Sequence, residues 1–249
     1  MPKKKSKKNA MSAAMFKLTG SSAKIRVNDK KRAMYYFSPK VDAEKAVDLA
    51  RRDGADILGV SPDDVKVGRP SLKYDFYCIY DATMEMKYLR VRTEEISVNE
   101  EVAGVLVGKE VLRVIKGREV PGKAIRVPLV ELFAVKRSDS MILDGTTGAP
   151  ARSLERLLKG PGRKRATMGW LKKAKVSPGR YNSLDKVVRA VTKVASAKPS
   201  GIKRVVTHTL DFKRLDGFYV PTYYVKVSAG DDSKTLRINA VSGNVAVKV

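Results

Sequence analysis

Side chains that usually perform catalysis are scarce in this sequence. His208 is the only histidine and Cys78 is the only cysteine. Neither belongs to a pattern that would pair a nucleophile with a general base. One histidine and one cysteine also cannot supply the usual ligands of a zinc site. We therefore expect no metal centre, no cofactor and no catalytic site built on these two residues.

Two further patterns are typical of phosphate or metal chemistry, but both are incomplete. Residues 104–110, GVLVGKE, resemble a phosphate loop that is one residue short and has Glu where a Ser or Thr would bind magnesium. Residues 144–148, DGTTG, are explained more simply as a tight turn. Paired acids such as Glu94-Glu95 would have to converge with acids from other strands to hold a metal. A non-enzymatic protein is therefore favoured, and a metal-dependent enzyme acting on nucleic acid is an alternative.

Cations are abundant and are concentrated in two segments. The chain has 51 Lys+Arg against 26 Asp+Glu, which gives a formal net charge of +25. Residues 1–40 contain 12 cations and one acid, Asp29, and residues 161–204 contain 13 cations and one acid, Asp185. Residues 41–110 instead contain more acids than bases. Charge that is segregated in this way favours two contact surfaces for a polyanion over a general solubilising charge.

The predicted contact residues come from these two segments. Flexible lysines near the N-terminus would displace counterions from phosphates, which makes binding depend on salt. Trp170 lies among the cations of the second segment, where it either stacks on an exposed base or anchors a helix to the core. The predicted nucleic-acid contacts are Lys3, Lys4, Lys5, Lys7, Lys8, Arg163, Lys164, Arg165, Trp170, Lys172, Lys173, Lys175, Lys186, Arg189 and Lys193.

A nucleic acid, DNA or RNA, is the expected partner. The competing polyanion is a membrane surface, but the apolar face around Trp170 is too short for strong insertion, and no stretch approaches the roughly 18 apolar residues of a membrane span. We expect a cytoplasmic protein, or a component of a ribonucleoprotein, chromatin or virion assembly. The alternative is a capsid or filament subunit that packages a genome, which would make the chain a homo-oligomer.

The elements that position these residues are predicted from hydrophobic periodicity. Apolar residues at helical spacing predict helices over residues 42–55 and 183–197, the second with Leu184, Val187, Val188, Val191 and Val194 on one face. A short helix is expected over 154–158, and another around Trp170. Alternation predicts strands over 72–80, 84–92, 111–115, 124–136, 205–210, 219–227, 235–240 and 245–249, and residues 141–143 lead into the turn at 144–148. The link Asp81-Ala82-Thr83 is expected to join the first two strands as a hairpin.

The order of these elements indicates an α+β protein with two helix-on-antiparallel-sheet modules. Ser38-Pro39, a helix and tyrosine-rich strands recur as Ser177-Pro178, a helix and tyrosine-rich strands. A duplication is one explanation, and the general likeness of all helix-then-hairpin units is the other. The expected division is a basic flexible arm over 1–23, an α+β module over 24–160, a basic linker over 161–176 and a second α+β module over 177–249.

A strand–turn–strand pattern in the second module also resembles a known family. Residues 221–227, PTYYVKV, and 235–245, TLRINAVSGNV, are similar to the PepSY pattern, in which a strand ending in Asp-Ala-x-Thr-Gly turns into the last strand. Residues 143–148, LDGTTG, are a second and weaker instance. Asn239 stands where the family has an acid. The resemblance implies a helix packed on an antiparallel sheet, and it carries over no catalytic residue.

Overall fold

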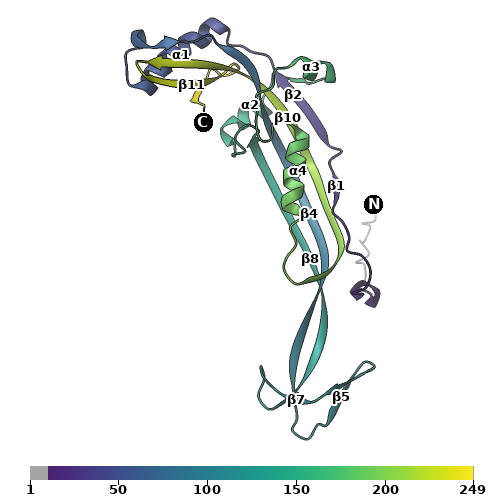
Figure 1. Cartoon of the computed structure of the whole chain (residues 1–249). Coiled ribbons are helices and arrows are strands. Elements are labelled where there is room, and N and C mark those ends of the chain that lie inside the picture. Colours follow the sequence, from purple (N-terminus) through teal and green to yellow (C-terminus); the bar gives the residue numbers. More distant parts are fainter. Residues whose placement is uncertain (1–10, 249) are drawn as a thin grey trace, which may run out of the picture. The chain divides into compact units, whose positions relative to one another are not determined.

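The computed structural model describes residues 11–248, and strands dominate it (Figure 1). The strands are β1 (Arg26–Asn28), β2 (Arg32–Phe37), β3 (Lys66–Val67), β4 (Ser71–Val98), β5 (Gly104–Val107), β6 (Glu110–Arg113), β7 (Ile115–Lys116), β8 (Lys123–Asp144), β9 (Arg163–Arg165), β10 (Ile202–Ala229), β11 (Asp232–Asn239) and β12 (Val245–Val247). The α-helices are α1 (Ala43–Leu58), α2 (Glu155–Lys159), α3 (Met168–Lys173) and α4 (Leu184–Ala195). Short 3-10 helices lie at Ala13–Phe16, Pro62–Asp64 and Arg152–Leu154.

The chain folds into two compact units, each built from segments far apart in the sequence. The first unit comprises the described residues up to Val27, Met84–Arg137 and Ser196–Leu210. The second unit comprises Asn28–Thr83, Ser138–Ala195 and Asp211–Val249. Strands β4, β8 and β10 contribute residues to both units. No helix among the described residues is long and apolar enough to cross a membrane.

The main sheet has ten strands, with both parallel and antiparallel pairs. Its central path is β12-β11-β10-β4-β8-β7. Strand β2 is paired with β10 in the parallel direction, with Phe218 opposite Tyr35. Its pairing with β9 is antiparallel. The expectation of two separate helix-on-antiparallel-sheet modules is therefore wrong, because strands from both parts of the sequence join one mixed sheet. Sequence periodicity identifies strands but does not say which strands pair, and pairing decides the architecture.

The predicted hairpin between residues 72–80 and 84–92 is also wrong, since both segments lie in the single strand β4. Asp81-Ala82-Thr83 has neither Gly nor Pro and stays extended. The Tyr80 hydroxyl donates to Asp139 Oδ2 at 2.7 Å, and the Thr83 and Ser138 hydroxyls lie 3.1 Å apart. Contacts from the neighbouring strand therefore hold this segment straight, and polar residues there do not mark a turn. Strand β10 merges two predicted strands in the same way, and β8 continues the predicted strand 124–136 as far as Asp144.

Helix α1 forms where it was predicted, and it packs on the C-terminal strands. The Asp42 side chain accepts a hydrogen bond from Lys45 N at the start of the helix, and Gly59 ends it in the left-handed region with φ of 69°. Small residues on the inner face allow close packing: a Cβ on Gly54 would lie 3.2 Å from Val227 Cγ1. The core beneath α1 includes Val225, Val227, Leu236, Ile238 and Ala240, which come from β10, β11 and the residue after β11.

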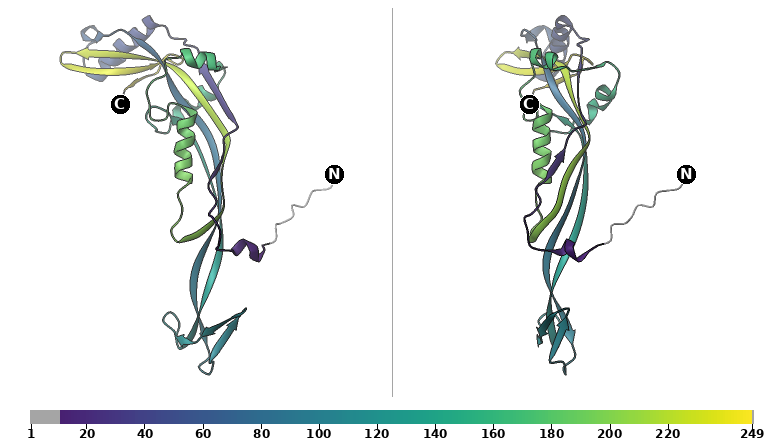
Figure 2. Two further views of the ribbon diagram at one scale, coloured as in Figure 1. Left: turned by 45° about the vertical axis from the view of Figure 1, so that its right-hand side comes forward. Right: turned by 90° about the vertical axis from the view of Figure 1, so that its right-hand side faces the viewer.

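Helix α4 lies beside the sheet within the second unit (Figure 2). Leu184, Val187 and Val188 are buried, and a Cβ on Gly217 of β10 would lie 3.2 Å from Leu184 Cδ2. Val194, however, is 77% exposed, so the predicted apolar face was one turn too long. A further core joins Phe37, Tyr77, Ile79, Ile142, Ala151, Leu158, Phe218 and Val220.

A carboxylate with little exposed area, Glu95, joins three parts of the first unit. Glu95 on β4 accepts hydrogen bonds from the backbone N–H groups of Arg118 and Glu119, and from the guanidinium of Arg126. These backbone hydrogen bonds are the main reason that the pKa of Glu95 falls to about 2. The carboxylate therefore fixes the loop before β8 while it is ionised.

Residues near the N-terminus of the described chain are bound to β10 in this unit. The Ala23 N–H donates to Val205 O at 2.8 Å, and the Val205 N–H donates to Ser22 Oγ at 3.1 Å. The Arg204 guanidinium donates to Lys17 O at 2.6 Å. The later part of the predicted arm, over residues 17–23, is therefore held by specific hydrogen bonds.

Candidate functional site

The predicted cations Arg163, Lys164 and Arg165 form the short outer strand β9. This strand pairs with β2, with Tyr35 opposite Arg165, and all three side chains are exposed. The Arg163 guanidinium lies 5.1 Å from the centre of the Tyr35 ring. Lys164 Nζ donates to Ser38 Oγ at 3.0 Å. The backbone of the basic strand is thus fixed by pairing while its charges face solvent.

Trp170 anchors helix α3 to the sheet. The Thr167 hydroxyl caps the helix by accepting a hydrogen bond from Trp170 N at 3.2 Å. The indole ring stacks on Tyr36 with ring centres 4.3 Å apart, and it also contacts Tyr74 and Tyr219. Figure 1 shows α3 beside β2, which carries Tyr36. This packing is the anchoring role that the sequence left open beside base stacking.

The remaining predicted contacts lie near α3 or on α4. Lys172, Lys173 and Lys175 are exposed at and just after the end of α3. Lys186, Arg189 and Lys193 are exposed on α4, away from its buried Leu184 side. The predicted contacts Lys3, Lys4, Lys5, Lys7 and Lys8 lie outside the described residues. We call the exposed cations of β9, α3, its C-terminal extension and α4 the basic surface.

Most cations of the basic surface have no carboxylate partner in the part of the chain that the structure describes. Within residues 11–248, its cations other than Lys193 form no ion pair with a carboxylate. The single acid of residues 161–204, Asp185, is itself paired with Arg32 Nη1 at 2.5 Å. Some cations elsewhere in the described chain do have acidic partners, as Arg52 has in Asp53 and Arg126 in Glu95.

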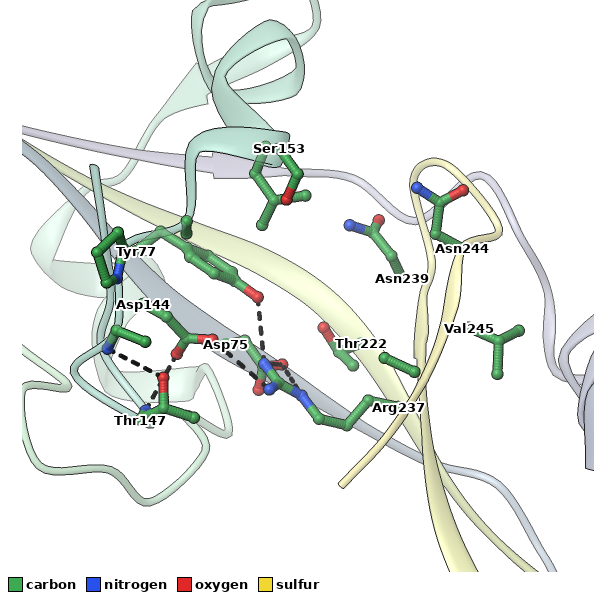
Figure 3. Close-up of a pocket in the computed structure, with 15 residues that line it drawn as sticks. Asp75, Tyr77, Asp144, Thr147, Ser153, Thr222, Arg237, Asn239, Asn244 and Val245 are labelled. Atoms are coloured by element: carbon green, nitrogen blue, oxygen red, sulfur yellow. Dashed lines mark hydrogen bonds and ion pairs between the residues drawn. The ribbon is translucent and has the colours of Figure 1, made fainter. Parts of the chain in front are cut away.

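A second candidate is a polar cavity of about 300 Å³ within the second unit (Figure 3). It lies between the turn that follows β8 and the turn that joins β11 to β12. Its lining residues are Asp75, Tyr77, Asp144, Thr147, Ala149, Pro150, Ala151, Ser153, Leu154, Thr222, Arg237, Asn239, Asn244, Val245 and Ala246.

A buried ion pair forms the floor of this cavity. Asp75 is fully buried, and its Oδ2 accepts hydrogen bonds from Arg237 Nη2 at 2.7 Å and Nε at 3.2 Å. The Tyr224 hydroxyl donates to Asp75 Oδ1 at 2.5 Å, and Arg237 Nη2 donates to the Tyr77 hydroxyl at 3.1 Å. Burial, together with the hydrogen bond to Asp75, raises the pKa of Tyr224 to about 12. Each buried charge therefore has hydrogen-bond partners, as a buried ion pair requires.

The turn after β8 is built around Asp144. Asp144 Oδ1 accepts hydrogen bonds from Thr146 N at 2.7 Å and Thr147 N at 3.3 Å. The Gly148 N–H donates to Asp144 O at 2.8 Å, and Gly148 has a φ of 82°. The prediction of a tight turn over DGTTG is confirmed. Asp144 Oδ2 is not used by the turn and faces Arg237 Nη1 at 3.6 Å.

The turn after β11 repeats this geometry around Asn239. Asn239 Oδ1 accepts hydrogen bonds from Val241 N at 2.9 Å and Ser242 N at 3.2 Å. The Gly243 N–H donates to Asn239 O at 2.8 Å, and Gly243 has a φ of 80°. Strand pairing before the two turns also corresponds, since Leu143 lies opposite Pro150 and Ile238 opposite Val245. An aspartate and an asparagine thus support the same turn on the two sides of one cavity.

Sequence reasoning missed the ion pair on the cavity floor. Asp75 and Arg237 are 162 positions apart, and neither was singled out. The available signal was a single acid, Asp75, inside the apolar run LKYDFYCIY. Because an unpaired carboxylate is costly to bury, that position required a cationic partner from elsewhere in the chain.

Residues with more familiar catalytic chemistry are buried. His208 is 3% exposed, and Cys78 is fully buried on β4. Burial raises the pKa of the Cys78 thiol, so it stays protonated at neutral pH. Among the described residues, no three His, Cys, Asp or Glu side chains are grouped so that they could hold a metal ion.

Comparisons with protein-family models, with curated proteins and with solved structures found no match to this chain.

Proposed function

We propose that this chain is a non-enzymatic protein that binds nucleic acid through charge, largely without regard to sequence. The observation that carries the proposal is the basic surface. Within residues 11–248, its cations other than Lys193 have no carboxylate partner. Lysine and arginine side chains presented in this way contact phosphates, and phosphate contacts carry little sequence information.

The elements of the basic surface suit such contacts because their backbones are held firmly. Pairing with β2 fixes β9, and the packing of Trp170 against three tyrosines fixes α3. The buried face of α4 turns Lys186 and Arg189 outward. Each phosphate contact releases condensed counterions, so the logarithm of affinity should fall linearly with the logarithm of salt concentration. The lysines of the first ten residues would add further contacts of the same kind.

Charge reversal on β9 tests this proposal. The variant replaces Arg163, Lys164 and Arg165 with Glu, and the control replaces the exposed α1 residues Lys45, Arg51 and Arg52 with Glu. Both variants change the net charge equally. We expect the β9 variant to weaken binding far more and to reduce the salt slope by about three, because each lost phosphate contact removes about one.

Binding is measured by fluorescence anisotropy on a labelled DNA duplex, single-stranded DNA and single-stranded RNA at several salt concentrations. Equal losses in the two variants would mean that only total charge matters, and the basic surface would not be a site. A flat salt response of the unmodified protein would refute electrostatic binding altogether.

A structural subunit that self-assembles around a genome is the second candidate. The observation that favours it is an apolar pair on the β5–β6 hairpin of the first unit, where Leu106 lies opposite Val111. These side chains are 67% and 73% exposed, respectively. Exposed apolar side chains that lie together favour protein contacts. Concentration-dependent sedimentation of nucleic-acid-free protein that is abolished by Leu106→Lys would support this candidate.

A further inference from the structure

The cavity of the second unit has features that its structural role does not require. Its charged groups are Asp75, Asp144 and Arg237, and Figure 3 shows the side chains of Tyr77, Asp144 and Arg237 converging on it. The basic surface contributes no residue to its lining. The cavity is therefore a candidate site that is separate from the proposed nucleic-acid contact.

Asp144 carries a charge that its turn does not need. The turn uses only Oδ1, and Asn239 supports an equivalent turn with a neutral amide. The second oxygen, Oδ2, faces the cavity floor and has Arg237 Nη1 as its nearest cationic partner in the described chain, at 3.6 Å. This separation is too long for a hydrogen bond. Asp144 Oδ2 is thus an acceptor with spare capacity.

Arg237 has a matching spare donor. Its Nε and Nη2 groups bind Asp75 and the Tyr77 hydroxyl, but Nη1 donates no hydrogen bond to any residue of 11–248. The Arg237 and Asp144 side chains are only 15% and 13% exposed, so contact with bulk water is restricted. The two groups face each other as an ion pair but form no hydrogen bond at this separation, so a ligand that hydrogen-bonds to both would satisfy them. The cavity therefore presents an unfilled donor beside an unfilled acceptor.

The charge of the cavity limits the ligand. Two carboxylates and one guanidinium give a net charge of about −1, which disfavours phosphates and carboxylates. A donor beside an acceptor is complementary to a neutral group that carries an acceptor beside a donor, such as a carboxamide or the edge of a nucleobase. The cavity volume, about 300 Å³, is at the lower end for small-molecule sites. Pro150 and Val245 give it apolar walls.

We infer that this cavity binds a small neutral molecule with an amide-type edge, whose acceptor meets Arg237 Nη1 and whose donor meets Asp144 Oδ2. Nucleobases and simple carboxamides share this chemistry. The inference goes beyond the proposed function and does not depend on it, because the basic surface takes no part in the recognition.

Ligand-observed NMR with the full-length protein tests the inference. The neutral probes are cytosine and nicotinamide, and the charged comparison probes are benzoate and benzylamine. We expect at least one neutral probe to bind at millimolar concentration and benzoate not to bind. Binding of cytosine alone would assign the site to nucleobases, and binding of nicotinamide alone would assign it to carboxamides. Failure of both neutral probes, or stronger binding of benzoate, would overturn the inference.

The variant Asp144→Asn locates the binding. Asparagine preserves the turn, as Asn239 does, but it replaces the charged acceptor. We expect about tenfold weaker binding of the neutral probe, the effect of losing one charge-assisted hydrogen bond. Asp42→Asn makes the same change at the helix cap of α1 and should bind as the unmodified protein does. The β9 charge-reversal variant should also bind the probe normally, which separates this test from that of the proposed function. Unchanged binding by Asp144→Asn would overturn the assignment.

Discussion

The ion pair between Asp75 and Arg237 gives a direct test of the energetics inside the second unit. The Asp75 carboxylate is fully buried and is held by Arg237 and by the Tyr224 hydroxyl. Replacing Arg237 with Met removes both guanidinium hydrogen bonds and leaves a buried carboxylate with one hydroxyl partner. Breaking a buried ion pair in this way costs about 3–5 kcal/mol. We expect Arg237→Met to lower the free energy of unfolding by that amount.

The double variant Asp75→Leu with Arg237→Met separates the pair from its surroundings. Both charges are then absent, and replacing a buried pair with apolar side chains is often nearly neutral. The Tyr224 hydroxyl loses its partner, which costs about 1 kcal/mol. We therefore expect the double variant to be more stable than Arg237→Met alone by about 2 kcal/mol.

Urea denaturation at pH 7 followed by circular dichroism measures these differences. For a chain of this size, each kcal/mol shifts the melting temperature by about 2–4 °C, so Arg237→Met should melt roughly 6–20 °C lower. The single variant Asp75→Leu completes the cycle. If the destabilisation of the double variant equals the sum of the two single variants, the residues are not coupled and the reasoning is refuted.

Three further predictions concern other parts of the chain. Because the pKa of Glu95 is lowered to about 2, its stabilisation should be complete above its ordinary pKa of about 4.3 and be lost as pH falls towards 2. Glu95→Gln should therefore be less stable than the unmodified protein at pH 7, with the gap closing in acid denaturation curves. A Cβ on Gly217 would lie 2.8 Å from Phe76 Cε2, so Gly217→Ala should cost about 1–3 kcal/mol in urea; Gly104→Ala, with its nearest atoms 3.9 Å away, is the control. Trp170→Leu should lower the melting temperature through lost ring packing and leave the affinity for single-stranded nucleic acid unchanged, whereas weaker binding with an unchanged salt slope would indicate that this residue stacks on a base.

Local structure could be predicted from the sequence where local chemistry decides it. The Asp42 cap and Gly59 bound α1 within a few residues of the prediction, and the DGTTG turn follows from its Asp and Gly residues. Strand continuity could not be predicted in the same way. Asp81 and Thr83 are ordinary turn residues by composition, but pairing with the neighbouring strand keeps β4 extended through them.

The basic surface and the cavity also differ in how far they could be predicted from the sequence. Segregated cations are visible in the sequence, whereas the lack of carboxylate partners for Arg163 and Lys172 among the described residues depends on the fold. The cavity is harder to predict from the sequence, because Asp75 and Arg237 meet only after β4, β10 and β11 have assembled. An acid within an apolar run indicates that a partner exists, but not which of the many arginines supplies it.

The packing of α1 has a consequence for how the chain folds during synthesis. Its apolar face is covered by Val225, Val227 and Leu236, which are translated long after the helix has left the ribosome. Contacts between residues so distant in the sequence close slowly, because the loop entropy must be lost first. Until β10 and β11 are available, the helix exposes its inner face and has nothing to bury it against. We expect the second unit to acquire its native structure only after β10 and β11 have been translated.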